Sequence, residues 1–185
     1  MPLHHDDRDV ELMHRLRGGD TAALDEALRR YWSPVVAYLL RICDESDVAE
    51  DVAQRTFLRL WERRSDWRPD GSLRGLLFRV ARNIAISEYR SELARERAEA
   101  VNAAFAVDPP TPLALRESEE LRDALDRAIE ALPTRRREVF VLRCIHELSY
   151  REIAEIMGIS TQTVANQLSA ALATLRATLG PLLDD

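Results

Sequence analysis

The sequence contains no lysine, and all 26 of its basic residues are arginine. The planar fork of arginine suits phosphates and base edges, although a GC-rich genome would produce the same bias. No apolar run approaches the roughly 20 residues of a membrane span, and the first residues lack the apolar region of a signal peptide. We therefore expect a cytoplasmic protein without membrane insertion.

Cysteine is also scarce. Cys43 and Cys144 lie far apart, with no CxxC motif, so neither a zinc site nor a disulfide framework is indicated. Both cysteines fall in apolar helical surroundings, which predicts buried free thiols.

Residue groups typical of enzymes are lacking as well. The sequence has no Gly-rich phosphate loop, no cluster of metal ligands, and no Ser-His-Asp or paired-carboxylate arrangement. His14 and His146 have no partners in view, and scattered acids on helices are normally solvent-facing. The sequence therefore predicts a protein that is not an enzyme, with no catalytic residues, no metal, no cofactor and no small-molecule substrate.

The charge is unevenly distributed. A net charge of −6 argues against a protein that coats DNA unaided. Residues 61–91 nevertheless hold seven arginines against four acids, a net of +3, whereas residues 1–20 hold five acids against three arginines. One segment of an acidic protein is therefore basic, and that segment needs an explanation.

Apolar residues recur at helical spacing along most of the chain. This predicts an all-α fold class, with N-terminal helices over residues 8–17, 21–31, 35–42, 48–63 and 73 to about 90. Asp20 is the expected N-cap of the second helix, and Pro34 is expected in the first turn of the third. Asp47 with Glu50 is the expected capping pair of the fourth.

The helix predicted over residues 48–63 has two faces. Val52, Thr56 and Leu60 form a core face. The second face mixes large apolar groups with an acid, and its members are Asp51, Gln54, Leu58 and Trp61. Such a mixture on an outer face suggests a protein-binding surface. Burial of the leucine and the tryptophan in the core is an equally good interpretation.

A loop with an aromatic residue among arginines follows over residues 64–72. Trp67 lies between Arg64 and Arg68, a stacking surface of the kind that single-stranded nucleic acid uses. Ser72 is the expected cap of the next helix, whose outer side shows Arg79, Arg82, Asn83, Ser87 and Arg90. This side is a candidate nucleic-acid face, because a merely solvated flank would usually carry more acids.

Three prolines in four residues, Pro109, Pro110 and Pro112, exclude helix and central strand. They predict a linker over 96–117, with residues 106–112 flexible, between two small helical domains over 1–95 and 118–185. The second domain should begin with an amphipathic helix over 118–131 that carries Leu121, Leu125 and Ile129 on one face.

The chain closes on a pattern typical of a helix-turn-helix. Ser149 and Glu152 form a capping box, and Gly158 stands where a sharp turn requires positive φ. Ser160 is a natural N-cap for a second helix. That helix places Val164, Leu168, Ala171 and Leu175 on one face and small polar side chains on the other. An ordinary helical hairpin is the alternative, but the spacing favours a helix that enters the major groove.

Four segments together carry a resemblance to a known family. They are GDTAALDEALRRYW, VAEDVAQRTFLRLW, GSLRGLLFRVARNIAISEYR and, after a Leu-Pro pair, REVFVLRCIHELSYREIAEIMGISTQTVANQLSAALATLR. The chain resembles the extracytoplasmic-function (ECF) group of bacterial RNA polymerase sigma factors, the compact members of the sigma-70 family. The resemblance covers most of the chain and leaves out only the tails and the Pro-rich linker.

The resemblance implies a factor that binds core RNA polymerase and directs promoter-specific initiation. It implies that the domain over 1–95 binds the polymerase clamp and recognises and melts the minus-ten element of promoter DNA. The polymerase contacts it implies are Asp51, Gln54, Leu58 and Trp61. The minus-ten contacts it implies are Arg64, Trp67, Arg68, Ser72, Arg79, Arg82, Asn83, Ser87 and Arg90.

It also implies that the domain over 118–185 recognises the minus-thirty-five element. The contacts expected there are Arg151, Thr161, Gln162, Thr163, Asn166, Gln167 and Ser169. Relatives often carry Lys or Arg near the positions of Ala165, Gln167 and Ala170, which are neutral here, so phosphate attraction would come from elsewhere, such as Arg135–Arg137, Arg143 or Arg151. An anti-sigma factor is a further candidate partner.

Two other functions remain open at this point. An autonomous helix-turn-helix regulator would bind a palindromic duplex without polymerase, but the basic, aromatic segment far from the helix-turn-helix argues against it. A pure interaction protein, whose helices only bind a partner, would show no promoter-dependent activity.

Overall fold

The computed structural model describes residues 7–43, 45–67, 72–99 and 117–183. These residues form eight α-helices and one short π-helical segment, with no strand among them. The elements are α1 (Asp7–Arg17), α2 (Thr21–Leu39), α3 (Ser46–Glu62), α4 (Leu73–Glu99), α5 (Glu117–Glu130), α6 (Thr134–Phe140), η1 (Val141–Ile145), α7 (Tyr150–Met157) and α8 (Thr161–Leu183). The predicted all-α fold class is confirmed. The predicted flexible segment, residues 106–112, lies outside the described residues.

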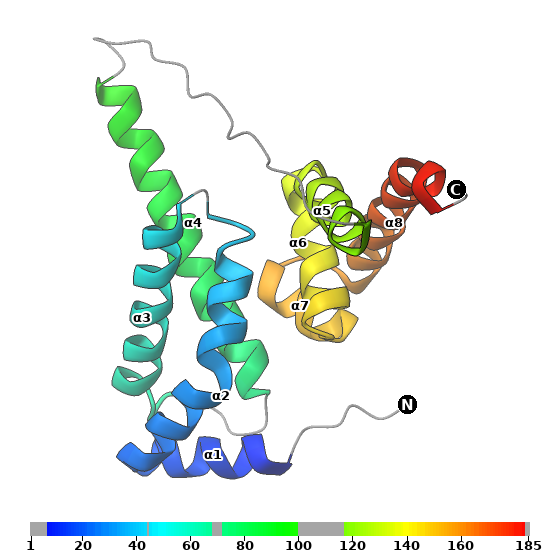
Figure 1. The fold of residues 1–185 in the computed structure, drawn as a ribbon. Helices are drawn as coiled ribbons and strands as arrows, with labels where there is room; N and C mark the ends of the chain where they lie inside the picture. The colour runs from blue at the N-terminus through cyan, green and yellow to red at the C-terminus, as the bar shows by residue number, and fades with distance from the viewer. Residues whose placement is uncertain (1–6, 44, 68–71, 100–116, 184–185) are drawn as a thin grey trace.

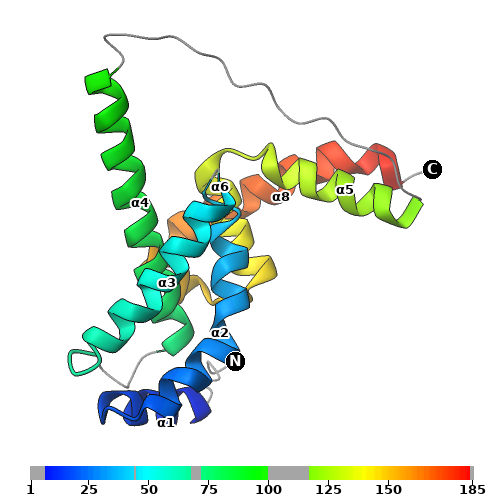
Figure 2. The same ribbon diagram turned by 60° about the vertical axis from the view of Figure 1, so that its left-hand side comes forward.

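The N-terminal helices form one packed unit. α2, α3 and α4 lie side by side, α1 crosses their lower ends, and the C-terminal half of α4 projects beyond the others (Figures 1 and 2). The core holds the predicted faces of α3 and α4, since Val52, Thr56 and Leu60 are buried, and so are Leu73 and Leu77. Each fully buried Val or Leu side chain contributes about 1.5–3 kcal/mol relative to exposure.

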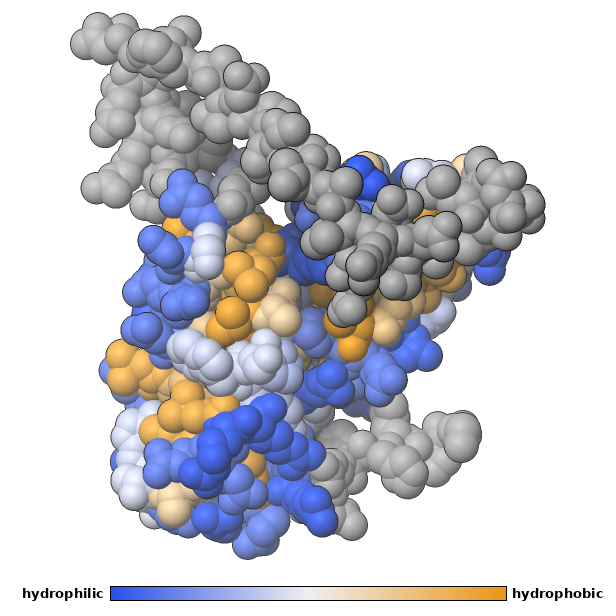
Figure 3. Space-filling model, in the orientation of Figure 1, coloured by the Kyte–Doolittle hydropathy of each residue, from blue (hydrophilic) through white to orange (hydrophobic). Residues whose placement is uncertain are grey.

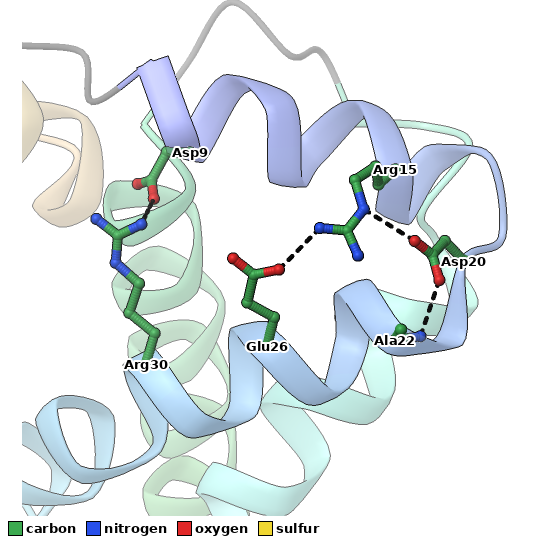
Figure 4. A network of polar contacts seen from close by, with 6 residues as sticks. All are labelled: Asp9, Arg15, Asp20, Ala22, Glu26 and Arg30. Carbon is green, nitrogen blue, oxygen red and sulfur yellow. Dashed lines mark hydrogen bonds and ion pairs between the residues drawn. The ribbon is translucent and has the colours of Figure 1, made fainter.

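The corner between α1 and α2 is fixed by polar contacts (Figure 4). Gly19 adopts a positive φ of 82°, and Asp20 caps α2 as predicted by accepting from the Ala22 N–H at 2.9 Å. Arg15 on α1 donates to Asp20 at 2.9 Å and to Glu26 on α2 at 2.8 Å. Its hydrogen bond to Asp20 lowers the pKa of that carboxyl.

A second polar contact joins the other end of α1 to α2. Asp9 is buried, and its Oδ1 accepts from the Tyr31 hydroxyl at 2.5 Å and pairs with Arg30 Nη1 at 3.0 Å. The pKa of Tyr31 is raised well above its ordinary value, mainly by burial and secondly by the adjacent Asp9 carboxylate. The two partners compensate the buried carboxylate, which would be costly alone.

Several details differ from the sequence predictions. Pro34 lies inside α2 instead of opening a new helix. Buried Tyr31, Val35 and Tyr38 on either side of it hold the helix, so their packing outweighs the lost hydrogen bond. The predicted capping of α3 by Asp47 with Glu50 is wrong, because α3 begins at Ser46, before both residues.

The C-terminal helices form a second unit. α5, α6 and α7 each pack against α8, and α5 and α8 run side by side in Figure 2. Val164, Leu168, Ala171 and Leu175 are buried as predicted. On α5, Ile129 is buried as predicted, but Leu125 is 40% exposed. The buried residues of this helix near its C-terminal end are Ala128 and Ile129, so Leu125 does not reach the core.

The two units pack against each other, since α4 contacts α7 and the buried residues of both form one cluster. Among the described helices, none combines the length and the apolar character that crossing a membrane requires.

Candidate nucleic-acid and protein interfaces

The outer face of α3 is open to solvent. Asp51, Gln54 and Leu58 are exposed, Leu58 at 55%, and Trp61 is half-buried at the edge of the core. Apolar surface lies over the lower, C-terminal end of α3 in Figure 3. Of the two interpretations of this face, the exposed surface therefore holds for Leu58, whereas Trp61 contributes both to the core and to the surface.

Arg64 fixes the end of this face. Its guanidinium carbon lies 4.4 Å from the centre of the Trp61 ring, and its Nη1 donates to the Trp61 carbonyl at 2.8 Å. A guanidinium over an indole is an attractive cation–π pair. Arg64 is thus held against α3, next to the predicted polymerase face. It is also the first residue of the loop that follows.

Trp67 is half-buried, and its indole N–H donates to the Leu60 carbonyl at 3.2 Å. This contact anchors the loop to α3 and leaves only part of the ring for stacking. Arg68 lies outside the described residues. Ser72 caps α4 as predicted, because its Oγ accepts from the Gly75 N–H at 3.1 Å.

The predicted basic side of α4 is partly open. Asn83 and Ser87 are exposed and Arg79 is half-buried. Arg82 differs, because its side chain is 17% exposed and its Nε donates to Glu138 Oε1 on α6 at 2.6 Å. Arg90 lies in α4, with its side chain outside the described part.

Glu138 is a residue that sequence reasoning missed. It is buried between the two units and also accepts from the Tyr38 hydroxyl at 2.7 Å. Its only signal in the sequence is an acid directly before the apolar run Val139–Leu142. His146, described above as lacking a partner, is buried in the same place, and burial, with Arg74 nearby, lowers its pKa to about 4.

The helix-turn-helix forms as predicted. The Ser149 Oγ accepts from the Glu152 N–H at 3.2 Å, and the Glu152 carboxylate accepts from the Ser149 N–H at 2.9 Å. Gly158 ends α7 in the left-handed conformation, at φ 65°. Ser160 Oγ then accepts from the Thr163 N–H at 3.0 Å, which starts α8.

The first turns of α8 present neutral polar groups. Thr161, Gln162, Asn166 and Ser169 are exposed, and Gln162 Nε2 donates to Asn166 Oδ1 at 3.0 Å. Thr163 and Gln167 are half-buried beside them. The paired amides still offer free donors and acceptors, because each amide carries two donors and an acceptor with two lone pairs.

Several arginines lie near this helix, and they differ in exposure and in the contacts that their side chains make within the protein. Arg151 is exposed and pairs with Glu155 at 3.2 Å, and Arg135 is exposed at the start of α6. Arg143 lies 5.8 Å from the Tyr150 ring and donates to the Leu148 carbonyl. Arg137 is turned toward backbone carbonyls at the end of α5, so it stabilises that end.

One prediction about the cysteines is wrong. Cys144 in η1 is exposed, and Cys43 is half-buried. Cys144 follows buried Leu142 by two residues, which places it on the opposite side of the helix from the core. Partial burial still raises the pKa of its thiol.

Two family models match the chain. The Sigma-70 region 2 model matches residues 27–95, which include α3, the loop and most of α4. The Sigma-70 region 4 model matches residues 122–175, which include the helix-turn-helix. The chain is also 30% identical over 184 residues to the ECF RNA polymerase sigma-E factor of Salmonella typhimurium, covering 95% of this chain and 96% of the relative. The chain belongs to the ECF RNA polymerase sigma factors.

Solved structures agree with this fold. The fold of this chain is similar to that of CnrH in its complex with the cytosolic domain of CnrY, at a TM-score of 0.69 and 24% identity, and the match covers 94% of this chain and 97% of CnrH. It is similar to the sigma factor RpoE of Bartonella quintana in complex with the anti-sigma factor NepR, at a TM-score of 0.65 and 22% identity, covering 84% and 96%.

As an ECF sigma factor, the protein directs promoter-specific initiation of transcription by RNA polymerase. The family is not catalytic. The autonomous regulator is not favoured, because the N-terminal half matches a sigma region as well as the helix-turn-helix half.

Proposed function

We propose that this ECF sigma factor divides its work between a domain over residues 1–95 and a domain over 118–185, joined by a linker over 96–117. The first binds core polymerase and recognises and melts the minus-ten element. The second recognises the minus-thirty-five element as duplex. One observation carries this proposal: the two matched sigma regions expose a mixed polar and apolar face on α3 and polar faces on α4 and α8.

The outer face of α3 would be the polymerase contact. Asp51, Gln54 and Leu58 are exposed side by side, with Trp61 at the edge. An exposed leucine next to an acid and an amide suits a protein partner, because it combines apolar burial with polar orientation. Arg64, stacked on Trp61, would order the end of this face.

The minus-ten contacts would come from the loop and from α4. Asn83 and Ser87 are exposed polar groups on a helix whose outer side is basic, and Trp67 anchors the preceding loop. A base flipped out of the duplex costs a few kcal/mol, which pocket contacts can return. Stacking of unpaired bases would contribute roughly 1–3 kcal/mol per base.

The minus-thirty-five contacts would be made by the start of α8. Gln162 and Asn166 expose amide groups, which suit adenine in the major groove, where guanine is most often recognised by Arg or Lys. Arg151 and Arg135 would supply phosphate contacts at the edges. The promoter element recognised should therefore depend on adenine contacts more than on guanine contacts.

The protein would act without catalytic residues or cofactor, in the cytoplasm. An anti-sigma factor is proposed as a further partner, since a sigma factor of similar fold has been solved with one.

Paired variants test the division of labour. With core polymerase present, Asn83→Ala should reduce promoter melting, measured by permanganate footprinting. Gln162→Ala with Asn166→Ala should weaken the closed complex and relax preference only at the upstream element, measured by filter binding on promoters mutated in each element. Unchanged preference of the double variant at the upstream element would refute duplex recognition by these amides.

A further inference from the structure

One buried carboxylate joins the two domains. Glu138 on α6 has a side chain only 7% exposed, and both of its oxygens are used by the N-terminal domain. Oε1 accepts from the Tyr38 hydroxyl at 2.7 Å and from Arg82 Nε at 2.6 Å, and Oε2 accepts from Arg82 Nη2 at 3.4 Å. A hydroxyl and a guanidinium thus compensate a charge that would be costly to bury alone.

Aromatic rings surround this contact. The Tyr38 ring lies 5.0 Å from Phe78, and the His146 ring lies 4.7 Å from Phe78 and 6.2 Å from Tyr38. All three residues are buried, and His146 Nε2 has no hydrogen-bond partner among the described residues, so the imidazole packs here as an apolar ring. Because the rings exclude water, the pairing of Glu138 with Arg82 is screened little.

The same interface is closed at its rim. Arg41 at the end of α2 pairs with Asp126 on α5 at 2.7 Å. At the other side, a Cβ placed on Gly75 would lie 3.7 Å from Glu152 Oε1, so α4 and α7 approach closely there. The contact through Glu138 is therefore the centre of an extended interface between the domains.

This arrangement removes one basic residue from the proposed DNA face. Asn83 and Ser87 on the same side of α4 remain exposed, whereas Arg82 is occupied by a carboxylate. A DNA phosphate and Glu138 would compete for the same guanidinium, since both accept its planar fork of donors. The closed arrangement and full DNA contact by α4 exclude each other at this residue.

We propose that Glu138 is an intramolecular latch that holds the two domains closed in the free protein and withholds Arg82 from single-stranded promoter DNA until the domains separate. The latch rests on the proposed function of the α4 face. It deepens that proposal by explaining how a free factor avoids binding DNA before polymerase orients its domains.

The size of the effect follows from the contact. Hydrogen bonds to charged groups contribute enough that losing one shifts an equilibrium by about tenfold to a hundredfold. If closed molecules predominate, the apparent affinity for DNA is reduced by the open fraction. Weakening the latch should therefore tighten DNA binding by the free protein by about tenfold or more, until the open form predominates.

The test uses the full-length protein with Glu138→Gln, which keeps the shape and an acceptor for Tyr38 but removes the charge that holds Arg82. Glu26→Gln is the matched control, because it removes one acid from a partly exposed pair within the N-terminal domain and leaves its partner Arg15 paired with Asp20. Small-angle X-ray scattering reports domain separation. Anisotropy of a fluorescent single-stranded oligonucleotide of mixed sequence reports DNA binding, since a phosphate contact does not depend on sequence.

We expect Glu138→Gln to increase the radius of gyration and to bind the oligonucleotide about tenfold more tightly, while Glu26→Gln matches the wild type. Adding Arg82→Gln to Glu138→Gln should keep the expansion and abolish the gain in binding. An unchanged radius of gyration overturns the latch. Expansion without tighter binding overturns the masking of Arg82.

Two further measurements distinguish failure of the latch from misfolding of the variant and from failure of the proposed function. If Glu138→Gln loses its cooperative thermal transition, Arg82→Gln, which removes the charged partner of the same carboxylate, takes its place, and absence of expansion in that variant overturns the latch. Specific transcription starts with core polymerase are measured in parallel. Their absence for the wild type would count against the proposed function, whereas the scattering result judges the latch on its own.

Discussion

The substitution Asp51→Arg should weaken binding to core polymerase while leaving the free energy of unfolding nearly unchanged. The Asp51 side chain is 60% exposed and lies 3.3 Å from Arg55, one turn later on α3. An exposed pair of this kind contributes about 0.3–0.5 kcal/mol, and the like-charge pair that replaces it costs a similar amount. The free energy of unfolding should therefore fall by less than about 1 kcal/mol. Arg55 also pairs with Glu88 on α4, which keeps the guanidinium in place.

The expected loss in binding is much larger. Reversing a charge that is desolvated in an interface costs about 2–5 kcal/mol. Because 1.4 kcal/mol is tenfold in affinity, core polymerase should bind the variant about thirtyfold or more weakly. The gap between this loss and the small change in stability is what the experiment measures.

The assay is competition between the variant and labelled wild-type protein for core polymerase, beside urea denaturation of each variant. Glu155→Arg is the control, since it breaks an equivalent exposed pair, Arg151 with Glu155 at 3.2 Å, in the other domain. The reasoning is refuted if Asp51→Arg competes as well as Glu155→Arg does, or if it lowers the free energy of unfolding by several kcal/mol.

Substitutions at three further positions test the fold. Ser149→Ala removes the α7 cap and should lower the free energy of unfolding by about 1 kcal/mol; urea denaturation showing no change would argue against the capping box. Gly158→Ala should cost about 1–2 kcal/mol from its left-handed φ alone, because the added Cβ would meet no described residue beyond its own chain neighbours within 4 Å, and Gly158→Asn should cost less. Burial, with Arg74 nearby, lowers the pKa of His146 to about 4 from an ordinary 6.5, so the unfolded chain binds the proton first. Stability should fall as pH drops from 6.5 toward 4, and His146→Phe should lose less across that window; identical denaturation profiles would contradict this.

Local structure could be predicted from the sequence wherever a short pattern determines it. The capping box at Ser149, the left-handed turn at Gly158 and the N-cap at Asp20 each depend on residues within a few positions. The core faces of α3, α4 and α8 follow from helical spacing. Where packing decides, spacing alone was insufficient: Pro34 stays inside α2 because buried residues hold the helix on both sides of it.

The interface between the domains could not be predicted, because it joins residues far apart in the chain. Tyr38 and Glu138 are 100 positions apart, and Arg82 and Glu138 are 56 apart. No periodicity relates such residues, so Arg82 was predicted only as a DNA contact. Helical spacing placed Leu58 and Trp61 on one face, but only the structure shows that Leu58 is exposed while Trp61 is partly buried.

Promoter-specific initiation by this sigma factor is measured by adding the purified protein to core RNA polymerase and mapping transcription starts on genomic DNA. We expect starts that appear only with the factor and that share upstream and minus-ten elements. Asn83→Ala should reduce these starts, and Gln162→Ala with Asn166→Ala should redistribute them. Absence of any factor-dependent start, with a polymerase preparation that responds to another sigma factor, would contradict promoter-specific initiation by this protein.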